Sequence, residues 1–356
     1  MKKYSAKINW IFVIVYIALF LGCFISQDIY SVVARFASLI TFVILCMLCA
    51  SVYKGVDSDM IVVLSGIAIT GFNLFYIHSN KGAFFTAADL LLMLYVSGKI
   101  IIDKRQMLSM SGIGSIILLF WYSTVRWDYN FNMAGLVFMI TTISCLIFFE
   151  LLKEEYKYLK YIQILSYLAG LLFCTLYHSR CAMMGLVIFG IIYICVPLIL
   201  KYNWLKNLLI FLSTVGAVLF TVLYVALSKT GFNITFLYKD ILSGRQDIWY
   251  ELWQALLSRP LTGIGSSYQL KSFFIFEVHN GLFDILAVHG VLVFCCVLYM
   301  LVKRLNYFLK IVKSDNMGRL AVAGTFAILF TSFFENFFIV SPYLLVFMFC
   351  MNLEHE

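Results

Sequence analysis

Long apolar runs separated by short polar segments dominate this chain. A membrane-spanning helix needs about 20 largely apolar residues, and twelve runs come close to that length, so we expect about 12 transmembrane helices. The predicted spans are 9–27, 32–52, 60–77, 84–102, 107–122, 133–152, 159–177, 181–200, 206–228, 281–302, 318–334 and 337–353. The last two divide one apolar stretch at Glu335-Asn336, because a charge in the middle of a bilayer is costly.

The interval 229–280 is the only long one without a spanning run. It divides the chain into a bundle of about nine spans (1–228), one large loop (229–280) and a C-terminal part of about three spans (281–356). We find no internal repeat and no linker rich in Pro, Gly or Ser. The pattern therefore predicts one membrane domain with one large loop, and no separate soluble domain.

The loop contains one predicted amphipathic helix, over residues 245–258. Ser243 is expected to be its N-cap, with Gln246 as the partner in a capping box, and Pro260 ends it. Trp249 and Trp253 lie on its apolar face. Two Trp residues on an amphipathic helix outside the bilayer predict a helix lying in the headgroup zone.

Composition supports a membrane protein. The chain is 63% hydrophobic and 12% charged, whereas a soluble domain is about half apolar and a quarter charged. We expect an all-α polytopic protein whose apolar surface faces lipid. Lys2, Lys3 and Lys7 precede an apolar run that has no small-residue cleavage site, which predicts a retained first span.

The distribution of basic residues predicts the orientation. Net charge is +8, and we interpret it through the cytoplasmic bias of Lys and Arg rather than through binding of nucleic acid. With a cytoplasmic N-terminus, inner segments hold 17 of the 26 Lys and Arg residues. The short outer segments hold Arg35, Lys81, Arg126 and Arg180. We therefore expect a multi-pass protein of the cytoplasmic membrane, with both termini cytoplasmic and 229–280 extracytoplasmic.

Cysteine usage and motifs argue against cofactors. Nearly all of the ten cysteines lie inside apolar runs, where cysteine behaves as a small apolar residue. Cys46 and Cys49 have C-x-x-C spacing, but they lie within a span and no second pair or His accompanies them. The sequence has no P-loop, dinucleotide fingerprint or metal-ligand cluster. We expect neither a metal nor a nucleotide cofactor.

Two arginines and one histidine are the best candidates for chemistry. Arg245 lies in the first turn of the loop helix, where helix amides and a guanidinium together form an anion site; contact with bulk headgroups is the alternative. Arg180 lies in the short outer turn 177–180, against the inner bias of basic residues, and a snorkelling side chain is the alternative. His279 ends the loop, and an imidazole there can take a proton from a sugar hydroxyl. A helix-capping role is its structural alternative.

Other polar positions gather near the predicted outer surface. Asp89 and Asp284 lie about one turn inside spans, and with Arg35 and Glu335 they make the outer half of the bundle polar. An outward-opening cavity or ion pairs between packed helices would each explain them. Two glycines, Gly263 and Gly265, form a turn where backbone can approach a ligand or another helix. Asn280 is placed to cap the tenth span.

These elements, taken in order, resemble a known family. Its pattern is carried by Ser243-Gly244-Arg245, Trp249, Pro260-Leu261, Gly263-Ile264-Gly265, His279-Asn280 and Gly290, and by the earlier Ser179-Arg180 turn. The set is similar to the signature block of the O-antigen polymerase and ligase superfamily, which comprises Wzy-type repeat-unit polymerases and WaaL-type ligases. The block covers about 50 residues, and the family architecture of many spans with one large outer loop covers the whole chain.

The resemblance implies an inverting glycosyl transfer at the outer membrane face, without metal or nucleotide sugar. Its donor would be an oligosaccharide on undecaprenyl pyrophosphate. By analogy Arg180 and Arg245 bind the pyrophosphate and His279 positions or deprotonates the acceptor hydroxyl. The further substrate-contacting positions are expected to be Trp249, Gly263, Gly265, Asn280 and Glu277. The acidic partner of His279 is not fixed: Glu277 is near in sequence, and a carboxylate from another span would serve equally.

The shared residues do not separate a polymerase from a ligase. The compact chain and its richness in Lys, Ile, Phe and Tyr favour a capsule or exopolysaccharide polymerase, for which a flippase and a chain-length regulator are the implied protein partners. A twelve-span transporter or flippase is the third reading. Transporters tend to carry repeats and midplane polar sites on broken helices, whereas the polar residues here lie at the outer end and in the loop.

Overall fold

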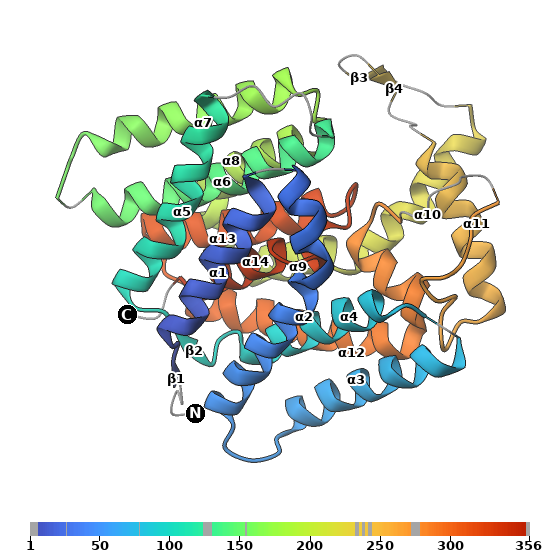
Figure 1. Ribbon diagram of the computed structural model, residues 1–356. Helices are drawn as coiled ribbons and strands as arrows, with labels where there is room; N and C mark the ends of the chain where they lie inside the picture. Colours follow the sequence, from blue (N-terminus) through green and yellow to red (C-terminus); the bar gives the residue numbers. More distant parts are fainter. Residues whose placement is uncertain are drawn as a thin grey trace.

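The computed structural model describes residues 6–25, 27–77, 79–123, 130–153, 155–231, 235–236, 239–240, 244–271 and 278–353. These residues form a helical bundle with two minute strand pairs (Figure 1). Ser243 and Glu277 lie outside the described residues, as does the side chain of Arg35. The predictions made for those three positions therefore have no structural counterpart.

A helix overlaps each of the first eight predicted spans. The helices are α1 Trp10–Phe24, α2 Gln27–Val52, α3 Ser58–Tyr76, α4 Lys81–Val96, α5 Lys104–Ser123, α6 Phe131–Leu152, α7 Leu159–Leu176 and α8 Arg180–Lys201. Polar caps set several of their starts: Asp57, Asn80 and Asn130 each accept a hydrogen bond from a backbone N–H in the first turn. Hydropathy and capping, both local in sequence, explain this agreement.

The second half of the chain is less regular. Its helices are α9 Asn203–Ser213, α10 Val215–Lys229, α11 Arg245–Ser258, α12 Gly281–Ile311, α13 Asn316–Thr331 and α14 Tyr343–Met351, with the 3-10 helix η1 at Phe337–Ile339. The strands β1 (Ala6–Lys7) and β2 (Ile100–Ile101) pair in parallel, and β3 (Thr235–Phe236) and β4 (Lys239–Asp240) pair antiparallel. The predicted span 206–228 is bent by 55° between α9 and α10.

The chain is a multi-pass membrane protein, but the count of twelve spans is not confirmed. Among the described residues, five helices are long and apolar enough to cross a membrane: α3, α6, α7, α8 and α12. The bent pair α9–α10 makes a sixth if it counts as one span. Several other apolar helices, such as α1 and α14, have fewer residues than the 20 or so that a bilayer core requires.

The last predicted span, 337–353, is replaced by a short helix at the centre of the bundle. α14 has nine residues and all of them are buried. It is apolar on every side and lies among the other helices (Figure 1). Its high hydropathy therefore reflects burial in protein rather than contact with lipid. The charged division at Glu335-Asn336 does separate two elements, since the chain there leaves α13 and re-enters a helix only after Pro342.

The tenth predicted span is also interrupted. α12 is broken at Gly290, whose φ of 79° and ψ of 176° are not helical. Segment 260–265 of the loop lies in the break: Ile264 N donates to Ala287 O (2.9 Å), Gly265 N to Val288 O (3.1 Å), and Val291 N to Pro260 O (2.8 Å). The freed backbone groups of the helix are therefore satisfied by the loop, as a break at membrane depth requires.

The first and last described residues lie at the same end of the helical bundle. β1 pairs with β2, and Gly98 N, just before β2, donates to Asn352 Oδ1 at 2.9 Å. The buried Asp59 lies near this end and binds Lys303 Nζ (2.5 Å) and Arg304 Nη2 (2.9 Å). These contacts tie α3, α4 and α12 together far from the loop that contains α11.

Candidate functional site

The loop helix α11 covers Arg245–Ser258, the range that the amphipathic pattern predicts. The residue at its N-cap position is Gly244. Gly244 has a φ of 87°, in the left-handed region that glycine adopts without steric cost. The Gln246 side chain does reach back, accepting a hydrogen bond from Gly244 N at 3.1 Å. This cap places Arg245 as the first residue of the helix.

The apolar face of α11 packs on protein, which contradicts the expectation that the helix lies in the headgroup zone. Trp249 is fully buried, and its ring centroid is 4.9 Å from that of Tyr224 on α10. Trp253 lies 4.8 Å from Phe283 on α12 and donates through Nε1 to Thr221 Oγ1 at 3.0 Å. The aromatic residues thus fasten α11 to the spans on either side of the loop.

His279 is held in an unusual backbone conformation. Its φ is 54°, in the left-handed region, which costs a residue other than glycine on the order of 1–3 kcal/mol unless its surroundings enforce it. Trp249 Nε1 donates to Val278 O at 2.6 Å. On the other side Asn280 Oδ1 accepts from Phe283 N (2.9 Å) and caps α12, while Asn280 Nδ2 donates to Ala217 O (2.9 Å). The contacts of Val278 and Asn280 therefore hold the backbone on both sides of His279.

Glu335 joins the two strongest candidates. Its Oε1 lies 2.7 Å from Arg245 Nη2 and its Oε2 lies 3.1 Å from His279 Nδ1. Asn132 Nδ2, from the first turn of α6, donates to the same Oε1 at 3.2 Å. The side chains of Arg245, His279 and Glu335 are only 11–21% exposed. We name Arg245, His279, Glu335 and Asn132 the Glu335 cluster.

Arg180 lies in the turn beside this cluster. It is the first residue of α8, and its neighbour Ser179 donates through Oγ to Asn132 O at 3.5 Å. Gly135 of α6 approaches the same turn so closely that a Cβ there would come within 2.1 Å of Ser179. Asn132 therefore links the Arg180 turn to Glu335.

A comparison with protein families matches part of the chain. Residues 165–298 match the family described as O-antigen ligase. This segment is similar to that family, which supports the resemblance to the O-antigen polymerase and ligase superfamily. The match runs from α7 into α12 and includes Arg180, Arg245, His279 and Gly290, whereas Glu335 and Asn132 lie outside it. No curated protein matches the chain.

A polar cavity lies next to the cluster at this end of the bundle. Its volume is about 250 Å³. The lining includes Asp284, His289 and Asn336, together with Asn80 and Ser266. Asn336 Nδ2 donates to Asp284 Oδ2 at 2.8 Å, and the buried His289 Nδ1 has no hydrogen-bond partner among the described residues. A cavity and ion pairs are the two explanations for the polar residues near the predicted outer surface, and the structure contains both. Asp89 is buried at 2% exposure and, among the described residues, belongs to neither.

Four residues expected to touch substrate make structural contacts within the chain. Trp249 and Asn280 are fully buried and hold the backbone on either side of His279. Gly263 packs against Gly290, where a Cβ on Gly263 would lie 2.5 Å from the Gly290 N atom. Gly265 lies against Ile77, the C-cap residue of α3. The glycines therefore make the helix approach expected of them, and Asn280 makes the expected cap. Contact of these four residues with substrate stays a prediction.

Sequence reasoning left the partner of His279 undecided and missed Asn132. Glu335 was visible as a charge interrupting an apolar stretch, but nothing in the sequence pairs it with His279. Asn132 carried no signal beyond a polar residue near the start of a span. Among the described residues, no group of three or more His, Cys, Asp or Glu side chains is arranged to hold a metal ion.

Proposed function

We propose that this protein is a polysaccharide polymerase. It transfers an oligosaccharide from undecaprenyl pyrophosphate to a lipid-linked repeat-unit acceptor at the outer face of the cytoplasmic membrane, without a metal. The observation that carries the proposal is the Glu335 carboxylate lying between Arg245 and His279, the two positions that the superfamily resemblance assigns to the pyrophosphate and to the acceptor.

His279 is the proposed general base. When its Nδ1–H donates to Glu335, the imidazole carries its lone pair on Nε2, the atom that accepts the proton of the acceptor hydroxyl. The acceptor oxygen then attacks the anomeric carbon as the bond from that carbon to the pyrophosphate oxygen breaks, and the configuration inverts. Glu335 stabilises the imidazolium that forms, as the carboxylate of a catalytic triad does.

Arg245 and Arg180 are the proposed holders of the leaving group. A guanidinium has five N–H donors, so Arg245 can keep its contact with Glu335 through Nη2 and still donate to phosphate. Charge on the departing pyrophosphate is stabilised electrostatically, and no proton has to be delivered to it. The adjoining cavity, with its amide, hydroxyl and carboxylate lining, is the proposed place for sugar hydroxyls.

The base is tested with purified enzyme and a synthetic lipid-linked donor. His279→Ala should lower the rate by about 10²–10⁴, the usual range for loss of a general base. His279→Gln keeps a hydrogen bond but cannot accept the proton, so it should be nearly as poor. Recovery of most of the rate in the Gln variant would show that His279 only orients the acceptor, and the base assignment would fall.

A ligase and a transporter remain testable alternatives, each with an observation in its favour. The matched family is described as O-antigen ligase, and α12 is a broken helix, a feature that transporters use. Deleting a polymerase should leave lipid-linked single repeat units on the outer face. Deleting a ligase should leave long lipid-linked chains. Single units retained on the inner face would instead indicate a flippase.

A further inference from the structure

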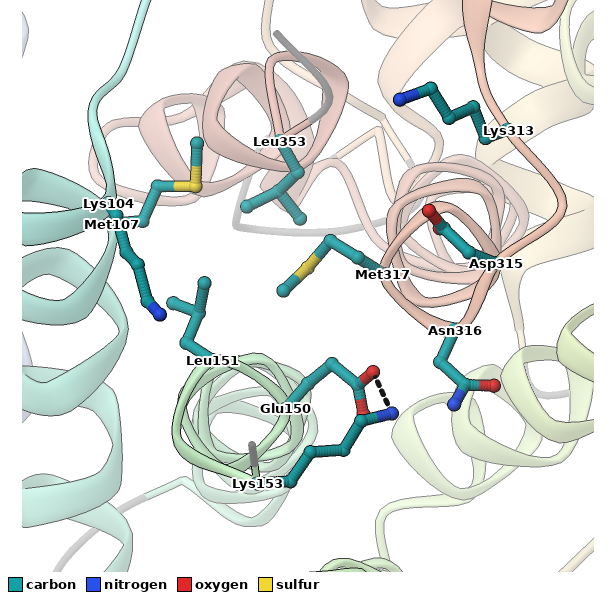
Figure 2. A pocket seen from close by; sticks show the side chains of 10 residues that line it. All are labelled: Lys104, Met107, Glu150, Leu151, Lys153, Lys313, Asp315, Asn316, Met317 and Leu353. Carbon is teal, nitrogen blue, oxygen red and sulfur yellow. Dashed lines mark ion pairs between the residues drawn. The ribbon is translucent and has the colours of Figure 1, made fainter. Parts of the chain in front are cut away.

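A second cavity, of about 460 Å³, lies between the ends of three helices. Figure 2 shows Lys104 at the start of α5, Glu150 near the end of α6, and Asn316 at the start of α13 around one opening. Leu353, the last described residue, closes one side. No residue of the Glu335 cluster lines this cavity.

The length of α6 places this cavity across the membrane from the Glu335 cluster. Asn132, in the first turn of α6, binds Glu335, whereas Glu150 and Lys153 at its other end line the cavity. The 18 residues from 132 to 150 rise by about 27 Å at 1.5 Å per residue. A bilayer hydrocarbon core is about 30 Å thick. The two sites therefore face opposite leaflets.

The lining is basic on balance. Lys104, Lys153 and Lys313 face Glu150 and Asp315, which gives 3 − 2 = +1. Both carboxylates have partners within the chain: Glu150 binds Lys153 and accepts from Gln163 Nε2 at 3.2 Å, and Asp315 accepts from Gly318 N at 2.8 Å. The N-terminus of α13 lies at the same place and is capped by Asp315, so the excess positive charge of the lining comes from the lysines. An anion is the ligand that this arrangement favours.

The same cavity also has apolar lining. Met107, Leu151, Met317 and Leu353 lie between the charged groups around it (Figure 2). A free anion gains nothing from these side chains, whereas an amphiphile buries its glycerol and upper acyl carbons against them. Basic pockets between membrane helices on the cytoplasmic side bind anionic lipid headgroups.

We propose that this cavity binds the headgroup of an anionic phospholipid from the cytoplasmic leaflet. Lysine side chains of the lining contact the phosphate, and the methionine and leucine side chains pack against the adjoining glycerol and acyl chain. The leaflet follows from the orientation proposed above, but the lipid site itself does not depend on the glycosyl transfer.

The test is binding of phosphatidylglycerol to the purified, delipidated full chain, measured by native mass spectrometry, with phosphatidylcholine of the same acyl length for comparison. Near a membrane surface each lysine changes affinity for anionic lipid by about five-fold, so Lys104→Gln with Lys313→Gln should weaken phosphatidylglycerol binding by about 25-fold. The control is Lys160→Gln with Lys201→Gln, which removes two lysines that lie outside the cavity and over the rings of Tyr161 and Tyr202.

The wild-type chain alone can overturn the proposal. Equal binding of phosphatidylglycerol and phosphatidylcholine would remove it, whatever the variants do. An equal loss in the control variant would show general attraction by surface charge and would also remove it. Displacement of phosphatidylglycerol by millimolar inorganic phosphate would identify a site for the free anion instead. A headgroup site requires preference for phosphatidylglycerol, loss in the cavity variant alone, and no displacement by phosphate.

Discussion

At the scale of single residues, Glu335 is the position on which the site depends. It is 9% exposed and accepts from Arg245, His279 and Asn132. A buried carboxylate persists only when it is paired and hydrogen-bonded. Removing one partner leaves the remaining charge buried without compensation, a change that is strongly destabilising in most proteins. Conservative substitutions therefore give the cleanest tests.

Glu335→Gln should abolish most activity while the protein still inserts. Glutamine can accept a hydrogen bond from Arg245, but it cannot stabilise an imidazolium on His279, and the matching change in a catalytic triad costs about 10⁴ in rate. We expect a loss on the order of 10²–10⁴ in purified enzyme. Glu251→Gln is the control, since Glu251 binds Tyr268 and Lys271 N on the far side of α11 and should leave the rate nearly unchanged.

The two arginines should not tolerate lysine. A guanidinium binds phosphate with a planar fork of donors, whereas an ammonium is a point charge on a flexible stem. Arg180→Lys and Arg245→Lys should each lose most polymer in cells at normal protein level. Arg259→Lys, at the exposed C-terminal end of α11, is the matched control and should retain polymer. Near-normal polymer from both test variants would show that the arginines are merely interfacial.

At the scale of elements, the break in α12 is joined to the loop. The turn 260–265 fills the gap at Gly290, and Asn73 of α3 donates to Thr262 O at 3.0 Å and to His289 O at 3.4 Å. The same loop contains α11, whose Trp249 holds the carbonyl before His279. The break and the loop thus set the position of the first half of α12, which His279 and Asn280 precede.

Gly263→Ala should destabilise the protein far more than Gly231→Ala. Both glycines have positive φ, 76° and 71°, so both alanines carry the same conformational cost of about 1–2 kcal/mol. A Cβ at Gly231 has no atom of the described residues within 4 Å, whereas one at Gly263 would lie 2.5 Å from backbone atoms of Val288 and Gly290. The measurement is thermal unfolding of both variants in detergent. Equal melting temperatures would show that the loop does not pack into the break.

At the scale of the whole molecule, the two ends of the bundle differ in chemistry. One end holds the Glu335 cluster and its polar cavity; the other holds the lysine-lined cavity and both ends of the described chain. Helices such as α6 connect the two. This polarity fits the expected orientation, in which basic residues gather on the cytoplasmic side and both termini lie there.

Orientation is tested with single cysteines in a cysteine-free background. Ser267→Cys, in the loop after α11, should react with an impermeant thiol reagent in intact cells, because the loop is expected outside. Ser314→Cys, just before α13, is the matched control and should react only after permeabilisation. Both positions are exposed, so burial does not bias the comparison. The reverse pattern would invert the topology and move the Glu335 cluster to the cytoplasmic side.

The sequence by itself determined the features that are local. Hydropathy located the first eight helices, and amphipathic spacing with Pro260 gave both bounds of α11. Arg180, Arg245 and His279 stood out because polar residues at a membrane surface are few and their chemistry is specific. Each of these inferences needs only neighbours within a few turns, where propensity and periodicity act.

Only the tertiary structure decided which of these residues meet. Glu335 lies 56 residues from His279 and 90 from Arg245 in the chain, yet it binds both. Hydropathy could not show that α14 is enclosed, because a helix surrounded by protein and one surrounded by lipid have the same apolar faces. Nor could it show the break at Gly290, which persists because a distant loop satisfies the freed backbone groups. The partners of Glu335 and of the backbone at Gly290 come from segments remote in sequence, so local sequence patterns cannot predict them.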